Sequence, residues 1–257
     1  PHLMAAPALI ALSHASRDPR TSTTVTALVA EVKAQRPDLR VERAFLEDPS
    51  VPVRWTKPAF QAVVDRLVRA GHDEVVVVPL ALSEVEVEVG EVQAAISAAA
   101  ERHPGLAIRM SALLGLEACF LEVLDERLRE ALRSSRVREL DALVLAAAGS
   151  TDALANQSVA RLARLWGSHH KLPVTAAYAT SAPPATGEAV RAFRGEGRRH
   201  IAVASLFLSP GVLTDRSTEM ALEAGAVAVS EPLGAHPEVA RMVLARYAVG
   251  AVELVPV

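Results

Sequence analysis

The sequence predicts an α/β protein made of two tandem domains, each with a parallel sheet flanked by helices. Short apolar runs alternate with longer helical patterns along the 257-residue chain. Strands that are separated by helices favour parallel sheets with right-handed crossovers. The same order of patterns then begins again near residue 141, which indicates an internal duplication.

The first half contains four strand–helix units that end near Ser135. Apolar runs predict strands over residues 6–12, 39–46, 73–82 and 105–114, and helical spacing predicts helices over 24–35, 57–71, 91–103 and 117–135. The third run, "DEVVVVPLAL", is apolar at successive positions, as expected of a strand that is covered on both faces.

The second half repeats these units in the same order. "ALIALSHASRD" from Ala8 matches "ALVLAAAGSTD" from Ala142, "VERAF" matches "VTAAY", "VVVVPLALS" matches "IAVASLFLS", and "ALLGLEACFLEVLDERL" matches "EPLGAHPEVARMVLARY". We therefore expect an N-terminal domain over residues 5–135 and a C-terminal domain over residues 141–257, joined by the charged segment "SRVRELD" and facing each other across a cleft.

Composition restricts the partners of the chain. The net charge of −3 offers no general attraction to nucleic acid or to anionic lipid, so an anionic ligand must be held by local arginines. The single cysteine, Cys119, excludes an internal disulfide and is typical of a reducing compartment. No apolar run has the length of a membrane span and no signal peptide is evident, which favours a cytoplasmic protein with no membrane partner.

The first candidate site follows the first predicted strand, because ligands of open parallel sheets bind outside the carboxyl ends of the strands. The loop there reads "SHASRDPR". One interpretation is a helix N-terminus with Ser16 or Asp18 as the N-cap and Pro19 in the first turn. Capping does not explain His14, and the second repeat has Ala148 at that position, so we expect His14 to be functional.

The second candidate follows the third strand and reads "LSEVEVEVGEV". If this segment is extended, Glu84, Glu86 and Glu88 lie on one face. The alternation is also typical of a solvated edge. Because the segment follows a neighbouring strand, its carboxylates would share a rim with His14, where they could bind a divalent cation or relay protons.

The second half offers a strand-to-helix loop, "LSPGVLTDRSTE", with Ser209, Gly211, Asp215 and Arg216. These residues either cap the next helix or contact an acidic substrate. The pair at 169–170, "HH", is expected to be solvated in a polar loop.

With these loops placed, the chain resembles the class II chelatases of the sirohydrochlorin cobaltochelatase and ferrochelatase type (CbiX/SirB type) in their long two-domain form. The resemblance covers nearly the whole chain and rests on "LSHASRDPR", "VVVVPLALS", "AAAGSTDALAN", "ASLFLSPGVLTDR" and "PLGAHPEVARMVLARY". It implies two flavodoxin-like domains and a cleft that takes a polycarboxylated tetrapyrrole, sirohydrochlorin, and inserts Co²⁺ or Fe²⁺ during sirohaem or cobalamin synthesis. No cofactor beyond the substrate metal ion is implied, and the duplication favours a monomer because one chain can form the cleft.

The resemblance also implies roles for residues. His14 would be the metal-facing base, with Glu86 and Glu88 as its catalytic partners, because an imidazole can both touch the ion and accept a pyrrole proton. The expected metal ligands are His14, Glu84, Glu86 and Glu88. The expected substrate-binding residues are Ser13, Ser16, Arg17, Arg20, Ser83, Ser150, Ser209, Gly211 and Arg216.

One position departs from the family pattern. The family carries a second histidine in the loop after the third strand, followed by an acidic residue and a proline, and here these positions are Val87, Glu91 and Gln93. Glu86 and Glu88 flank the missing imidazole and could replace it as oxygen ligands. The alternative function is therefore a non-catalytic relative that binds a tetrapyrrole or a metal ion without insertion.

Overall fold

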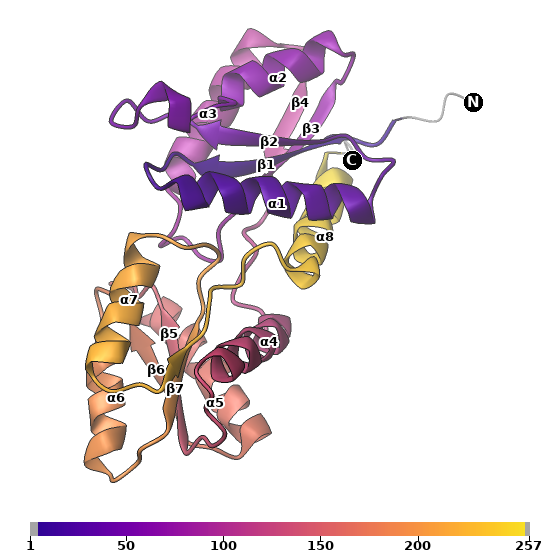
Figure 1. Ribbon diagram of the computed structural model, residues 1–257. Helices are drawn as coiled ribbons and strands as arrows, with labels where there is room; N and C mark the ends of the chain where they lie inside the picture. The colour runs from indigo at the N-terminus through magenta and orange to yellow at the C-terminus, as the bar shows by residue number, and fades with distance from the viewer. Residues whose placement is uncertain (1–4, 255–257) are drawn as a thin grey trace. The chain divides into compact units, whose positions relative to one another are not determined.

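The computed structural model describes residues 5–254 and divides into two compact units (Figure 1). The first unit comprises the chain up to Gly115 together with the chain from Ala235 onward, and the second comprises Leu116–Gly234. Each unit contains a four-stranded parallel sheet flanked by helices, so the predicted fold class is confirmed. No helix within residues 5–254 is both long enough and apolar enough to cross a membrane.

The first sheet has the strand order β2-β1-β3-β4. Its strands are β1 (Ala8–His14), β2 (Val41–Leu46), β3 (Glu74–Pro79) and β4 (Ala107–Met110). Its helices are α1 (Pro19–Gln35), α2 (Phe60–Arg69), α3 (Val89–Arg102) and α8 (Pro237–Glu253), with a short 3₁₀ helix, η1 (Val53–Trp55). Because β1 lies between β2 and β3, its last residue, His14, emerges at the middle of the carboxyl edge and pairs with Leu46.

Alternation along the strands divides the core of this unit between two faces. On one face Ile10 and Val77 pack with Val64 of α2 and Ile96 of α3, each fully or nearly fully buried. Burial of one such side chain contributes about 1.5–3 kcal/mol. On the other face Val76 meets α8, which lies beside α1 (Figure 1).

The second sheet repeats this arrangement with the order β6-β5-β7-β8. Its strands are β5 (Ala142–Ala147), β6 (Val174–Tyr178), β7 (Ile201–Ser205) and β8 (Ala228–Val229). Its helices are α4 (Cys119–Ser134), α5 (Ala153–His170), α6 (Thr186–Gly195) and α7 (Val212–Glu223). The central strand pairs in the same way in both sheets: Leu9 lies between Val41 and Val76, and Leu143 lies between Val174 and Ala202.

The boundaries between the units differ from those expected from the sequence. Residues 116–135 were expected with the first sheet and residues 235–257 with the second. In the structure α4 packs on β7 and β8, while α8 packs on β3 and α1. The two repeats thus exchange their last helices. Both helices carry an apolar stripe, and the periodicity that reveals such a stripe does not specify which of two similar sheets it covers.

Candidate active site

The first candidate loop presents His14 directly from the sheet. Leu12 and Ser13 are buried, whereas the His14 side chain is exposed at the end of β1. The chain then turns into α1, where the Asp18 carboxylate accepts the Arg20 N–H at 3.0 Å and caps the helix. Ser16 Oγ accepts the Asp18 N–H at 3.1 Å and stabilises the turn. The predicted helix cap is therefore confirmed at Asp18, and it leaves His14 outside the capping interactions.

The loop after β3 does not form the extended row of carboxylates considered above. The Glu86 N–H donates to the Ser83 carbonyl at 3.1 Å, and the Glu86 carboxylate folds back to accept the Leu82 N–H at 2.8 Å. The segment is a turn, so the condition under which Glu84, Glu86 and Glu88 would share one face, an extended backbone, is not met. An extended segment here would need a neighbouring strand to pair its backbone groups, and the turn satisfies them locally instead.

A pocket of about 210 Å³ lies where these two loops meet. It is lined by Leu12, Ser13, His14, Leu46, Val85, Glu86, Val87, Glu88, Glu91 and Val92. Glu84 is exposed and does not line it, whereas Glu91, which was not expected among the ligands, does. The sequence did contain a signal for Glu91, since it stands at the acidic position of the family pattern after the third strand.

Burial changes the acid–base properties of two pocket residues. Burial raises the pKa of the Glu86 carboxyl to about 7, although the hydrogen bond from the Leu82 N–H acts in the opposite direction. Burial also lowers the pKa of the His14 imidazole from its ordinary value of 6.5, even though the residue retains an exposed surface. At neutral pH His14 is therefore mainly an unprotonated base, and Glu86 is poised to exchange a proton.

The pocket carries carboxylates but no preassembled metal cage. Within residues 5–254, His14, Glu84, Glu86 and Glu88 do not bring three ligand atoms within 4.8 Å of one another. A second hollow of about 330 Å³ shares Leu46 and Glu91 with the pocket and adds Glu47 and Asp48 to its lining. An acidic surface thus continues outward from His14, and it favours the approach of a cation.

The expected substrate-binding residues of the first unit have contacts of their own, and Ser13 is the member of this set that lines the pocket. Ser13 lines the pocket and donates from Oγ to the His14 carbonyl at 3.1 Å. The Arg17 guanidinium donates to the Ser50 carbonyl, and Arg20 forms an ion pair with Asp18 at 2.6 Å. Ser83, through its carbonyl, forms the turn that places Glu86.

In the second unit the expected residues follow two neighbouring strands, β5 and β7. Ser150 Oγ accepts the Asp152 N–H at 2.9 Å, just as Ser16 Oγ accepts the Asp18 N–H in the first unit. Asn156 binds the Ser150 backbone from both sides, accepting its N–H at 3.0 Å and donating to its carbonyl at 2.8 Å. The sequence interpretation did not single out Asn156, because a polar side chain in a first helical turn is an ordinary surface feature.

After β7, the Ser209 carbonyl accepts the Thr214 hydroxyl at 3.0 Å, and Gly211 is the N-cap of α7. Arg216 is exposed on α7. These contacts show that the loop forms the start of α7. None of them involves the Arg216 guanidinium, which lies at the surface.

A family model described as CbiX matches the chain twice, over residues 8–131 and 142–249. The chain belongs to the CbiX family. The two matches correspond to the two repeats recognised in the sequence, and the resemblance to class II chelatases is thereby confirmed.

Named members and neighbours of the CbiX family agree with this assignment. A sirohydrochlorin cobaltochelatase of Priestia megaterium is 26% identical over 213 residues, which are 81% of this chain and 66% of the relative, so the chain spans just under two thirds of that protein. SirB from Bacillus subtilis with Fe³⁺ has a TM-score of 0.76 at 20% identity, with 96% of each chain covered. The sirohydrochlorin chelatase SirB from B. subtilis subspecies spizizenii, in complex with cobalt, has a TM-score of 0.73 at 19% identity, again with 96% of each chain covered. At these identities the solved structures support the fold.

Proposed function

We propose that this CbiX-family protein inserts a divalent metal ion, Co²⁺ or Fe²⁺, into sirohydrochlorin, and that it does so as a cytoplasmic monomer in sirohaem or cobalamin synthesis. The observation that carries the proposal is the position of His14 at the carboxyl end of the central strand, in a pocket that also holds Glu86, Glu88 and Glu91. The name of the Priestia relative, a sirohydrochlorin cobaltochelatase, supports the same reaction.

Insertion requires that two pyrrole N–H protons leave the macrocycle as one M²⁺ ion enters it. The neutral His14 imidazole can bind the incoming ion or accept one proton. Glu86, with a pKa of about 7, can take up a proton and release it to solvent at neutral pH. Glu88 and Glu91 are exposed, so they can attract the hydrated ion without losing their own solvation.

The absence of a preassembled cage within residues 5–254 fits this reaction. A chelatase must release its ion to the macrocycle, and an ion held by few protein ligands leaves more readily than one in a closed site. In the proposal the protein provides His14 and a carboxylate, and the pyrrole nitrogens complete the coordination.

The remaining predicted residues belong to the proposal as substrate contacts. In the first unit these are Ser13, Ser16, Arg17, Arg20 and Ser83, and in the second they are Ser150, Ser209, Gly211 and Arg216. Arginine side chains and the N–H groups of helix N-termini suit the side-chain carboxylates of the macrocycle.

A second candidate function rests on Val87, which lines the pocket at the position of the family's second histidine and packs partly against the core. An apolar side chain can neither bind the ion nor move a proton. The protein would then hold the tetrapyrrole or the ion without catalysing insertion.

The decisive experiment is an anaerobic spectrophotometric assay of sirohydrochlorin with Co²⁺ or Fe²⁺. We expect the protein to accelerate insertion and His14→Ala to lose about 100-fold or more of that acceleration, because a positioned base contributes about 10²–10⁴-fold. His72→Ala is the matched control, since His72 precedes β3 at the opposite edge of the same sheet. A rate equal to the spontaneous one, with the macrocycle bound, would establish the second candidate function.

A further inference from the structure

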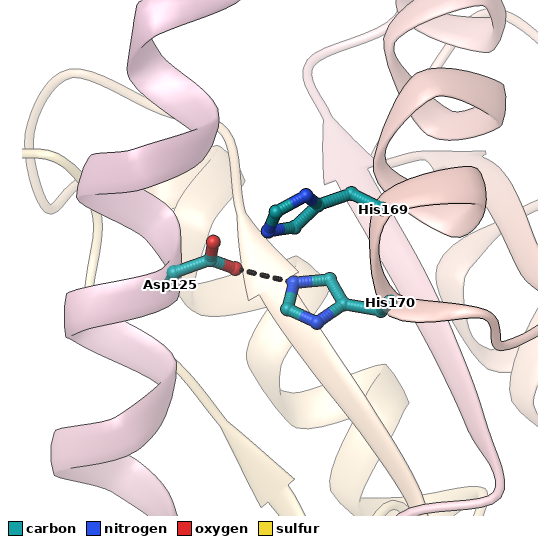
Figure 2. Close-up of side chains that lie close together, drawn as sticks. All are labelled: Asp125, His169 and His170. Carbon is teal, nitrogen blue, oxygen red and sulfur yellow. Dashed lines mark hydrogen bonds and ion pairs between the residues drawn. The ribbon is translucent and has the colours of Figure 1, made fainter.

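The second unit contains a cluster of metal-ligating side chains that the proposed function does not use. Asp125 of α4 and the two last residues of α5, His169 and His170, bring one ligand atom each within 4.8 Å of the others (Figure 2). The expectation of a polar loop at these two histidines is wrong, whereas His169 is exposed to solvent as expected. α5 extends through His170, and both rings lie close to Asp125.

The arrangement of the two histidines is unusual for neighbours in a helix. Consecutive helical side chains point about 100° apart and do not face each other. Here the ring centroids of His169 and His170 are 5.0 Å apart. The helix ends at the next residue, Lys171, which adopts a left-handed conformation. Both imidazoles therefore lie on the same side of the C-terminal end of α5, where both can bind one ion.

The Asp125 carboxylate is held in place by a buried side chain. Trp166, which is 1% exposed, donates its indole N–H to Asp125 Oδ1 at 2.8 Å. His170 Nε2 lies 2.7 Å from the same oxygen. The carboxylate is only 14% exposed, whereas the His170 side chain is 31% exposed. Such an outer hydrogen bond orients a ligand in metal sites before the ion arrives.

A second histidine–aspartate pair in the chain provides a comparison. His103 Nε2 also lies 2.7 Å from an aspartate oxygen, that of Asp65. Asp65, however, is paired with the Arg102 guanidinium, so a cation already neutralises it. Asp125 lies instead beside the neutral Trp166 indole and a second imidazole, that of His169. Neither group carries the fixed positive charge of a guanidinium, so a metal ion can supply it.

We propose that Asp125, His169 and His170 bind a divalent transition-metal ion of the kind that prefers imidazole, such as Zn²⁺, Ni²⁺ or Cu²⁺. Two imidazoles and one carboxylate form a borderline ligand set that suits these ions better than Mg²⁺ or Ca²⁺. Binding would release the hydrogen shared by Asp125 and His170 to solvent, and the two ligand atoms, now 2.7 Å apart, would separate to admit the ion, with water completing its coordination. The proposal is independent of the pocket around His14.

The test is a calorimetric titration of metal-free protein with Zn²⁺. His14→Ala serves as the background, so that an ion bound in the pocket does not contribute. We expect this background to bind Zn²⁺, and the added substitution His169→Ala to weaken binding at least about 10-fold. His169 is exposed, so its removal leaves the fold intact. Adding Asp125→Asn, which retains an oxygen acceptor for Trp166, is expected to weaken binding to a similar extent.

His103→Ala in the same background is the matched control, because it breaks a histidine–aspartate pair of equal length without touching the cluster. Thermal unfolding gives a second readout, because an ion that binds the folded state raises its midpoint. We expect Zn²⁺ to raise the midpoint of the background and of the His103 variant by similar amounts, and to raise that of the His169 variant clearly less. Equal Zn²⁺ affinity with and without His169, or no binding to the background, would overturn the proposal.

Discussion

Arg246 of α8 donates to the carbonyl of Leu114 at 2.9 Å and to that of Leu113 at 2.8 Å. The other repeat has the same interaction, in which Arg127 of α4 donates to the Leu233 carbonyl at 2.9 Å. The two arginines occupy equivalent positions in the aligned repeats, "DERL" and "LARY". Each of the two exchanged helices, α8 and α4, is thus hydrogen-bonded to the segment that follows the last strand of the sheet on which the helix packs.

We expect Arg246→Ala to lower the free energy of unfolding by about 1.5–3 kcal/mol, as measured by urea denaturation. Two charge-assisted hydrogen bonds are lost, and the carbonyls they satisfied lose their partner. Arg241→Ala on the same helix is the control. Arg241 is largely exposed and pairs with Glu238 at the surface, so we expect a change below about 1 kcal/mol. Equal effects of the two substitutions would contradict a special role for Arg246.

Gly149→Ala is expected to destabilise the protein by at least about 2 kcal/mol. Gly149 has a φ of +90°, and a Cβ there would lie 2.0 Å from the Thr180 carbonyl oxygen. Gly90 is the control, since it lies in α3 with nothing within 4 Å of an added Cβ. Gly90→Ala should stabilise by about 0.4–1 kcal/mol. Chemical denaturation of both variants checks the prediction.

The raised pKa of Glu86 predicts a pH dependence of stability. Between about pH 4.5 and 7 the folded protein retains a proton that the unfolded chain has lost, so stability falls as pH rises through this window. The loss amounts to about 3 kcal/mol above pH 7. Glu86→Gln should remove this component, while Glu88→Gln, at an exposed carboxylate, should retain it. Urea denaturation at pH 5 and pH 8 distinguishes them.

His14 should titrate below its ordinary value of 6.5, because burial disfavours the charged ring. An NMR titration of the histidine Cε1–H resonances measures this directly, with His14→Ala identifying the signal. The sign for stability is opposite to that of Glu86: a lowered histidine pKa makes the folded state less stable as pH falls below about 6.5. A midpoint at or above 6.5 would contradict the burial of the ring.

Val87→His should increase the affinity of the pocket for Co²⁺, because it adds an imidazole to a site lined by His14 and Glu86. Val85→His is the control. Val85 also lines the pocket but is 40% exposed, and Val87, unlike Val85, packs against the core cluster. Equilibrium dialysis with Co²⁺ should show a gain of about 10-fold for Val87→His and a smaller one for Val85→His.

Several features of this protein could be predicted from the sequence because they depend on local patterns. Apolar periodicity identified both sheets and the duplication. The loop after the first strand predicted a helix cap at Ser16 or Asp18, of which Asp18 is the cap of α1, and the strand pattern placed His14 at a carboxyl edge. Each of these follows from residues close together in the chain, where backbone geometry and side-chain spacing determine the structure.

Other features were decided only by tertiary structure. The last helix of each repeat covers the sheet of the other, although its apolar stripe suits either sheet. Glu86 folds back onto the Leu82 N–H, so the expected row of carboxylates does not form. Asp125 meets His170 across 45 residues of sequence, because α4 and α5 come together in the second unit. Local periodicity determines which face of a helix or strand is apolar. Contacts between distant parts of the chain determine which surface that face covers, and therefore which polar groups meet.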